Sequence, residues 1–293
     1  MTDAPFDQFD QLDLTDLTRP TAQNHLAWFG ELLEQATTAA IAAGRLIVDE
    51  RPPGPLQVAA TKSSATDIVT EMDHRSEELV LRIIGAARPD DGFLGEEGAD
   101  RTGTSGVTWV IDPIDGTVNY LYGIPTYAVS VAARLGDDVV AGAVVNPVSG
   151  KLYTATRGGG AFLDGRPLGW IDPPPLDRAL VATGFGYRPK RRARQAEVLR
   201  TLLPAVRDIR RPGSASLDLC SVATGQVDAY FEQGTKPWDT AAGGLIATET
   251  GVVLTGLRGE GPSEAMVVAA RPPLVNALAE LLASLDADAD PDL

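Results

Sequence analysis

The sequence is poor in cysteine, histidine and positive charge. Its single cysteine, Cys220, excludes an internal disulfide and suits a reducing cytoplasm. The two histidines, His25 and His74, stand in no triad-like context, so no activated nucleophile is evident. The net charge of −15 argues against non-specific binding of nucleic acid and against binding to anionic membrane surfaces.

Long apolar runs are also missing, and no stretch approaches the length of a transmembrane helix. The N-terminus is acidic where a signal peptide would be basic, so we expect a cytoplasmic protein without a membrane partner. The 293 residues can form one large catalytic unit made of two packed halves, over 21–175 and 176–285. A flexible acidic arm over 1–20 and a disordered acidic tail over 286–293 would flank them.

Helix and strand patterns mix along the chain without strict alternation. Apolar residues at helical spacing predict helices over 22–50, 67–81, 196–206 and 271–285. Runs separated by turn residues predict an antiparallel meander over 127–163, and shorter strands are expected at 180–183, 208–211 and 228–232. This mixture indicates an α+β protein with layered, mainly antiparallel or mixed sheets.

The stretch Trp109–Thr117, W-V-I-D-P-I-D-G-T, carries the main chemical signal. An apolar strand is expected to end at Asp112, before a proline, and Asp115 follows across a tight turn, so both carboxylates can face one point. Gly116 allows close approach of the backbone to a ligand, and the N–H groups of Gly116 and Thr117 open a helical turn that favours anions. This arrangement suits a divalent cation and a phosphate. The alternative is a capped turn with two solvated aspartates.

Three segments together carry a family resemblance: Gly95-Glu96-Glu97, Trp109 to Asn119, and Trp238 to Gly243. In this order they resemble the inositol monophosphatase family of magnesium-dependent, lithium-sensitive phosphatases. A further match comprises Lys62, Asp67, Val69, Thr70 and Asp73, and the similarity extends from about Lys62 to Gly251. The resemblance implies a five-layer α-β-α-β-α sandwich and a homodimer.

The resemblance also implies a set of magnesium ligands. Glu96, Asp112 and the carbonyl of Ile114 would hold a first ion, and Asp112, Asp115 and Asp239 a second. A third, weaker ion would lie near Glu96 through waters. Taken singly, Glu96 could be a surface acid and Asp239 a helix N-cap.

Roles in catalysis and substrate binding follow from the same resemblance. Asp73 and Thr117 would orient and deprotonate the attacking water, with Lys62 behind the metal ligands. The substrate's phosphate would lie against Gly116 and Thr117. Its polyol would meet a group of residues from both halves of the chain: Asp115, Gly213, Ser214, Ala215, Glu232 and Asp239. Glu232 could instead be a surface acid at the end of a strand.

The function favoured by these residues is magnesium-dependent hydrolysis of myo-inositol 1-phosphate by direct attack of water. Related phosphatases acting on histidinol phosphate, fructose 1,6-bisphosphate or 3′-phosphoadenosine 5′-phosphate are alternatives. A different class is a regulatory binding protein acting on RNA or the transcription machinery. The basic run at 188–194 leaves that role open, although a solvated loop and helix start is the plainer interpretation of the run.

Overall fold

A computed structural model describes residues 22–52, 60–61 and 68–290. The predicted arm over 1–20, Lys62, Asp67 and the last three residues lie outside this description. Among the helices of the described residues, none is long and apolar enough to cross a membrane.

The larger sheet has eight strands in the order β10-β9-β8-β7-β6-β5-β3-β4. All neighbours pair antiparallel except β3 and β5, which are parallel. The predicted meander is confirmed as β6 to β9. The strands are β3 (Gly92–Gly95), β4 (Asp100–Arg101), β5 (Val107–Asp115), β6 (Ala128–Leu135), β7 (Asp138–Asn146), β8 (Lys151–Thr156), β9 (Gly160–Leu163) and β10 (Arg166–Pro167).

The smaller sheet has five strands in the order β12-β11-β13-β15-β14. Here β11 runs parallel to β12 and β13, while β15 is antiparallel to β13 and β14. These strands are β11 (Leu180–Thr183), β12 (Asp208–Arg210), β13 (Ala229–Glu232), β14 (Val253–Thr255) and β15 (Val267–Ala270). Two short strands, β1 (Ala60–Thr61) and β2 (Ile68–Val69), form a separate antiparallel pair.

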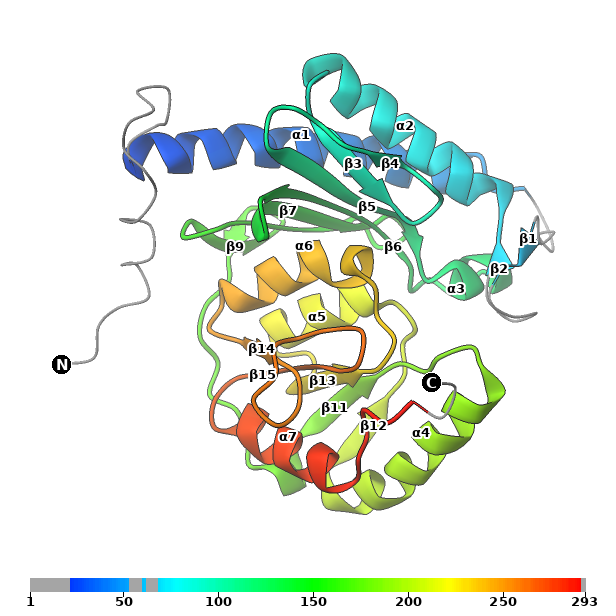
Figure 1. The fold of residues 1–293 in the computed structure, drawn as a ribbon, viewed down its shortest axis with the longest axis vertical. Coiled ribbons are helices and arrows are strands. Elements are labelled where there is room, and N and C mark those ends of the chain that lie inside the picture. Colours follow the sequence, from blue (N-terminus) through cyan, green and yellow to red (C-terminus); the bar gives the residue numbers. More distant parts are fainter. Residues whose placement is uncertain (1–21, 53–59, 62–67, 291–293) are drawn as a thin grey trace.

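Helices form three layers around the two sheets (Figure 1). One outer layer is α1 (Ala22–Asp49) with α2 (Glu71–Ala87), the central layer is α5 (Ala215–Thr224) with α6 (Pro237–Thr248), and the other outer layer is α4 (Pro189–Leu202) with α7 (Leu274–Ser284). The short α3 (Thr117–Tyr122) follows β5, and 3₁₀ turns occupy Leu176–Arg178 and Leu203–Ala205. The predicted α+β class and five-layer sandwich are confirmed.

Strand periodicity divides the apolar residues of β5 between two cores. Trp109 and Ile111 pack beneath α1, whereas Val110 points to the core beneath α6. On the α6 side the contact is tight, since a Cβ built on Gly142 of β7 would lie 3.0 Å from the Cα of Ala242. Small residues therefore bring α6, with Asp239 in its first turn, close to the larger sheet.

The predicted helices over 67–81 and 196–206 differ from α2 and α4 at both ends. Helix α2 begins at Glu71 because Thr70 and Asp73 form a capping box, and Val69 belongs to β2 instead. Helix α4 begins at Pro189, a residue favoured in the first helical turn. The basic run therefore contains the predicted helix start, and its residues after Arg188 are helical where a loop was also expected. After α7, Arg258 donates to Asp288 and Arg191 pairs with Asp290, so residues 286–290 of the predicted tail contact the rest of the fold.

Candidate active site

The motif at the end of β5 has a β-bulge at its centre. Asp112 pairs with Ser130 and Asp115 with Ala128 of β6, and the register shifts between these pairs. The strand therefore continues to Asp115, where the sequence predicted an end at Asp112. A bulge accommodates the intervening proline, which cannot donate to the ladder, and it changes the direction of the following side chain. Both carboxylates are buried, with Asp112 1% and Asp115 7% exposed.

Four carboxylates from three elements meet at this bulge. Glu96 follows β3, where its N–H donates to the Ile111 carbonyl at 3.2 Å. Asp239 lies in the first turn of α6 and accepts from the Lys236 N–H at 2.6 Å. Burial raises the pKa of Asp112 well above its usual range, and the charges of Glu96, Asp115 and Asp239 raise it further. Burial and the charges of Asp115 and Glu96 likewise raise the pKa of Asp239. The predicted acids are thus brought within electrostatic reach of one another.

Asp115 is bound by the start of α5. Its carboxylate accepts from the Ser214 hydroxyl at 2.6 Å, the Ala215 N–H at 3.1 Å, the Ser216 N–H at 2.7 Å and also the Ser216 hydroxyl. Burial raises the pKa of Asp115, and these hydrogen bonds oppose the rise. Because Asp115 belongs to the larger sheet and α5 to the following half, this carboxylate ties the two parts of the fold together at the site.

Gly116 brings two backbone segments together. Its φ of 99° is in the left-handed region, and a Cβ there would lie 3.0 Å from the Gly213 carbonyl oxygen. The Asn119 side chain donates to the Thr126 carbonyl at 2.6 Å and to the Pro212 carbonyl at 2.8 Å, which holds the same segment. Helix α3 begins at Thr117, so the predicted helical turn after Gly116 is present.

Asp73 and Thr117 are in contact. The Thr117 hydroxyl lies 3.0 Å from Asp73 Oδ1 and 3.1 Å from the Ile114 carbonyl oxygen, so it can donate to either. The other oxygen, Asp73 Oδ2, accepts from the Thr70 N–H at 2.8 Å and from the Thr70 hydroxyl. Asp73 is fully buried, and this burial raises its pKa to about 6 although the Thr70 hydrogen bonds oppose the rise.

Glu232 is partly buried at the end of β13, within electrostatic reach of the buried acid Asp218. The Tyr230 hydroxyl donates to Glu232 Oε2 at 2.9 Å, and burial raises the pKa of Glu232 to about 7. A Cβ on Gly184 would overlap the Glu232 carboxylate, so this glycine is the surface on which the carboxylate lies. Asp218 is 1% exposed, and burial followed by the charges of Glu232 and Asp115 raises its pKa.

Three supporting residues had no predicted role. Glu77 of α2 accepts from the N–H groups of Glu97 at 2.9 Å and Ala99 at 3.0 Å, and so fixes the turn that carries Glu96. Ser216 binds Asp115, and Asn119 holds the segment before Gly213. Asn119 ends the quoted motif and could have been singled out. The other two depend on contacts between distant parts of the chain, which no local pattern reveals.

Comparison with known proteins identifies the family of the chain. The model of the inositol monophosphatase family matches residues 28–288. The chain belongs to this family. It is 49% identical over 234 residues to the inositol-1-monophosphatase SuhB of Mycobacterium tuberculosis, covering 76% of this chain and 80% of the relative. It is 37% identical to the Nus factor SuhB of Salmonella typhimurium, covering 84% and 94%. The crystal structure of the extragenic suppressor protein SuhB from Bartonella henselae aligns with a TM-score of 0.81 at 34% identity, covering 86% and 98%.

The acids of this inositol monophosphatase homologue have the donor chemistry that magnesium requires. Over residues 22–52, 60–61 and 68–290, no three acid, histidine or cysteine side chains are arranged to hold an ion as the chain stands. The candidate donors are nevertheless all oxygens, which suit a hard cation. Burial is the main cause of the raised pKa of Asp112, and the charges of Glu96, Asp115 and Asp239 add to it. A divalent cation would offset that repulsion. From the part of the chain that the structure describes, Asp115 Oδ1 accepts one hydrogen bond, from the Ala215 N–H, which leaves it a lone pair.

Proposed function

We propose that the protein is a magnesium-dependent phosphatase of small polyol phosphates, with myo-inositol 1-phosphate as the favoured substrate. The observation that carries this proposal is the convergence of Glu96, Asp112, Asp115 and Asp239 at the bulge of β5. Two of these acids, Asp112 and Asp115, are buried, and Glu96 and Asp239 are partly buried beside them. Placing four acids this close together disfavours folding unless a positive charge offsets their repulsion, and the family supports cation binding as that offset.

Glu96, Asp112 and the Ile114 carbonyl would hold one magnesium ion, and Asp112, Asp115 and Asp239 a second. A third, weaker ion would lie near Glu96. Magnesium, when bound, would neutralise charge on the phosphate and favour ionisation of the attacking water. Asp115 would bind an ion through Oδ1, because Oδ2 is occupied by Ser214 and Ser216.

The chain's own residues would handle the proton. The Thr117 hydroxyl lies between the β5 bulge and Asp73, so it can accept a proton from the attacking water while it donates its own to the carboxylate. Asp73, with a pKa of about 6, is mostly ionised at neutral pH and close to the basicity that suits a general base there. The N–H groups of Gly116 and Thr117 are the proposed contacts of the phosphate.

Glu232 and Asp239 are the proposed acceptors for the polyol hydroxyls. Both acids belong to the half of the chain that follows the metal motif, and they are joined by the short connection from β13 to α6. Hydrogen bonds from vicinal hydroxyls would stabilise the ionised form of Glu232, whose pKa of about 7 leaves it half protonated at neutral pH without substrate. Substrates without these hydroxyls would lose that contribution.

The test is phosphate release from myo-inositol 1-phosphate, histidinol phosphate, fructose 1,6-bisphosphate, 3′-phosphoadenosine 5′-phosphate and propyl phosphate. Turnover should require magnesium, favour the inositol ester, and fall with lithium or high calcium. Asp112→Asn should abolish most turnover. Asp138→Asn removes an exposed acid from an Arg157 ion pair and should leave turnover unchanged. Full turnover in excess EDTA after exhaustive dialysis would contradict the metal dependence.

A regulatory role is less well supported by this structure. A regulatory role is suggested by the name of one relative, Nus factor SuhB. The basic run at 188–194 would then be the expected surface for contact with RNA or the transcription machinery. Arg191 and Arg194 of that run, however, bind the chain's own C-terminal residues. A homodimer and a cytoplasmic location stay predictions, the first of which sedimentation would test.

A further inference from the structure

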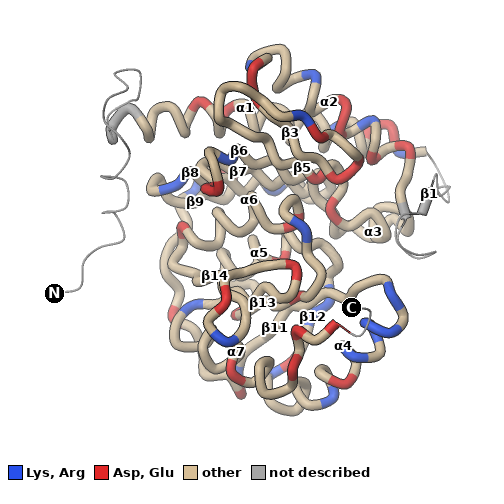
Figure 2. The backbone as a smooth tube through the Cα atoms, in the orientation of Figure 1, with Lys and Arg blue, Asp and Glu red and all other residues tan. Residues whose placement is uncertain are grey.

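The segment after α7, residues 286–290, is bound at several points. Arg258 donates to Asp286 at 2.5 Å and to Asp288 at 2.6 Å, and Arg191 of α4 pairs with Asp290. Ala287 between them is 4% exposed and packs in the core of the smaller sheet. Figure 2 shows Lys and Arg gathered on α4 beside this end of the chain. We call residues 286–290 the C-terminal strap.

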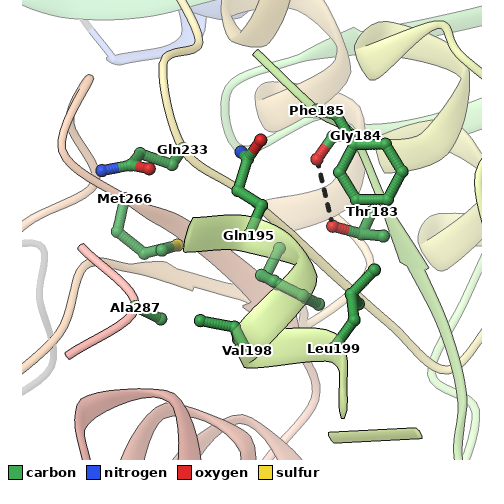
Figure 3. A pocket seen from close by; sticks show the side chains of 10 residues that line it. Thr183, Gly184, Phe185, Gln195, Val198, Leu199, Gln233, Met266 and Ala287 are labelled. Atoms are coloured by element: carbon green, nitrogen blue, oxygen red, sulfur yellow. Dashed lines mark hydrogen bonds between the residues drawn. The ribbon is translucent and has the colours of Figure 1, made fainter. Parts of the chain in front are cut away.

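The strap contacts the connection between β13 and α6. The Gln233 side chain, itself 4% exposed, donates to the carbonyl of Asp288 at 3.0 Å and to that of Ala289 at 3.3 Å. Figure 3 shows Gln233, Met266 and Ala287 among the side chains that line a pocket. The volume of this pocket is about 10 Å³, at the lower limit for holding one water molecule. The two hydrogen bonds of the buried Gln233 side chain therefore tie the strap to the connection.

Arg191 links the strap to the surface beneath Glu232. Its side chain crosses two glycines, since a Cβ on Gly234 would lie 2.5 Å from Arg191 Nη1 and one on Gly186 would lie 2.7 Å from its Cδ. Gly186 is two residues from Gly184, on which the Glu232 carboxylate lies. The Arg191 and Asp290 side chains are 15% and 10% exposed, so solvent screens this ion pair far less than a surface pair.

This connection joins the two proposed polyol acceptors. The connection comprises residues 233–236. Glu232 lies directly before it, and at its end the Lys236 N–H donates to the Asp239 carboxylate. We propose that the C-terminal strap positions Glu232 and Asp239 through Gln233 and Arg191, and so sets the preference for polyol phosphates over simple alkyl phosphates. This inference rests on the proposed phosphatase function. A strap that only stabilises the fold would affect both kinds of substrate alike.

The test compares kcat and KM for myo-inositol 1-phosphate and propyl phosphate in the full-length protein and three variants. Deletion of 286–293 and Arg191→Asp should each lower the ratio of the two kcat/KM values roughly tenfold, mainly through KM for the inositol ester. The double variant Arg191→Asp with Asp290→Arg restores an ion pair with its charges exchanged, so its ratio should return most of the way to the value of the full-length protein. Arg200→Asp, which removes an exposed pair with Glu197 on the same helix, is the control and should leave the ratio unchanged.

Hydrogen exchange at the amides of 233–236 gives a readout that does not depend on turnover. Exchange should become faster in the deletion and in Arg191→Asp, and should be restored in the double variant. Equal losses on both substrates, an unchanged ratio or unchanged exchange would overturn the strap's positioning role. If the full-length protein hydrolysed neither ester, the proposed function would fail, and exchange alone would decide whether the strap orders the connection.

Discussion

Replacing Asp73 by asparagine should change how the stability of the metal-free protein depends on pH. The Asp73 side chain is fully buried, and burial is the main cause that raises its pKa from 3.8 to about 6. A rise of about two pH units corresponds to about 3 kcal/mol of differential interaction between the two protonation states. Asparagine has nearly the same shape and no charge to desolvate.

The direction follows from the raised pKa of Asp73. Below about pH 4 the carboxyl is protonated in both the folded and the unfolded chain, so the folded protein does not have to bury a charge at Asp73 and is at its most stable with respect to this group. As the pH rises towards the folded-state pKa of about 6, the unfolded chain ionises first and that contribution is lost. Between pH 4 and 7 the Asn variant should therefore gain about 3 kcal/mol relative to the wild type. The asparagine would also bind Thr70 less well at the start of α2, which would lower the free energy of unfolding of the variant by about 1 kcal/mol at every pH. This constant loss would leave the change between pH 4 and 7 as it is.

Urea unfolding in EDTA at fixed ionic strength, from pH 4 to 8, measures the effect. Thr117→Val serves as a second variant, because it removes a hydrogen bond that lowers the pKa of Asp73 while leaving the carboxyl in place. It should keep the wild-type pH dependence with its midpoint at a higher pH. A constant difference between Asp73→Asn and the wild type across this range would refute the view that burial controls this carboxyl.

Four further outcomes are expected. Thr117→Ala and Asp73→Asn should each lower kcat about 10²–10⁴-fold, with a double variant only slightly worse than the worse single one, as transient kinetics would show. Asp239→Asn should abolish most turnover yet raise the melting temperature of the metal-free protein by about 2–4 °C, because it relieves repulsion. Glu232→Gln should reduce kcat/KM for inositol 1-phosphate far more than for propyl phosphate. Ser216→Ala should lower the free energy of unfolding by about 1–3 kcal/mol, since it removes a donor from the buried Asp115 carboxylate.

Local sequence patterns were sufficient for the parts of the fold that local forces determine. The meander from β6 to β9 followed from β-branched runs and turn residues, and the division of Trp109 and Val110 between two cores follows from strand periodicity. The proximity of Asp112 and Asp115 also followed from their spacing. The bulge between them did not, because the pairing register depends on β6, which no pattern within β5 specifies.

The features that the sequence did not predict depend on distant partners. Arg191 and Asp290 are 99 residues apart, and each looked solvated in isolation: one in a basic run, the other in an acidic tail. Their pairing places α4 and the C-terminal strap side by side. The start of α2 is a different case, because Thr70 and Asp73 form a local capping box that competed with a longer apolar pattern and prevailed.

Asp115 shows why the site requires both parts of the fold. Its carboxylate is 7% exposed, and all its described donors belong to Ser214, Ala215 and Ser216 at the start of α5. Without α5 the same carboxylate would lose these donors, and an unpaired buried charge is strongly destabilising. In return, the Gly213 carbonyl can lie close to residue 116 because Gly116 has no Cβ. Packing of the two parts and formation of the acidic site are therefore one event, and substitutions at this seam should affect stability and catalysis together.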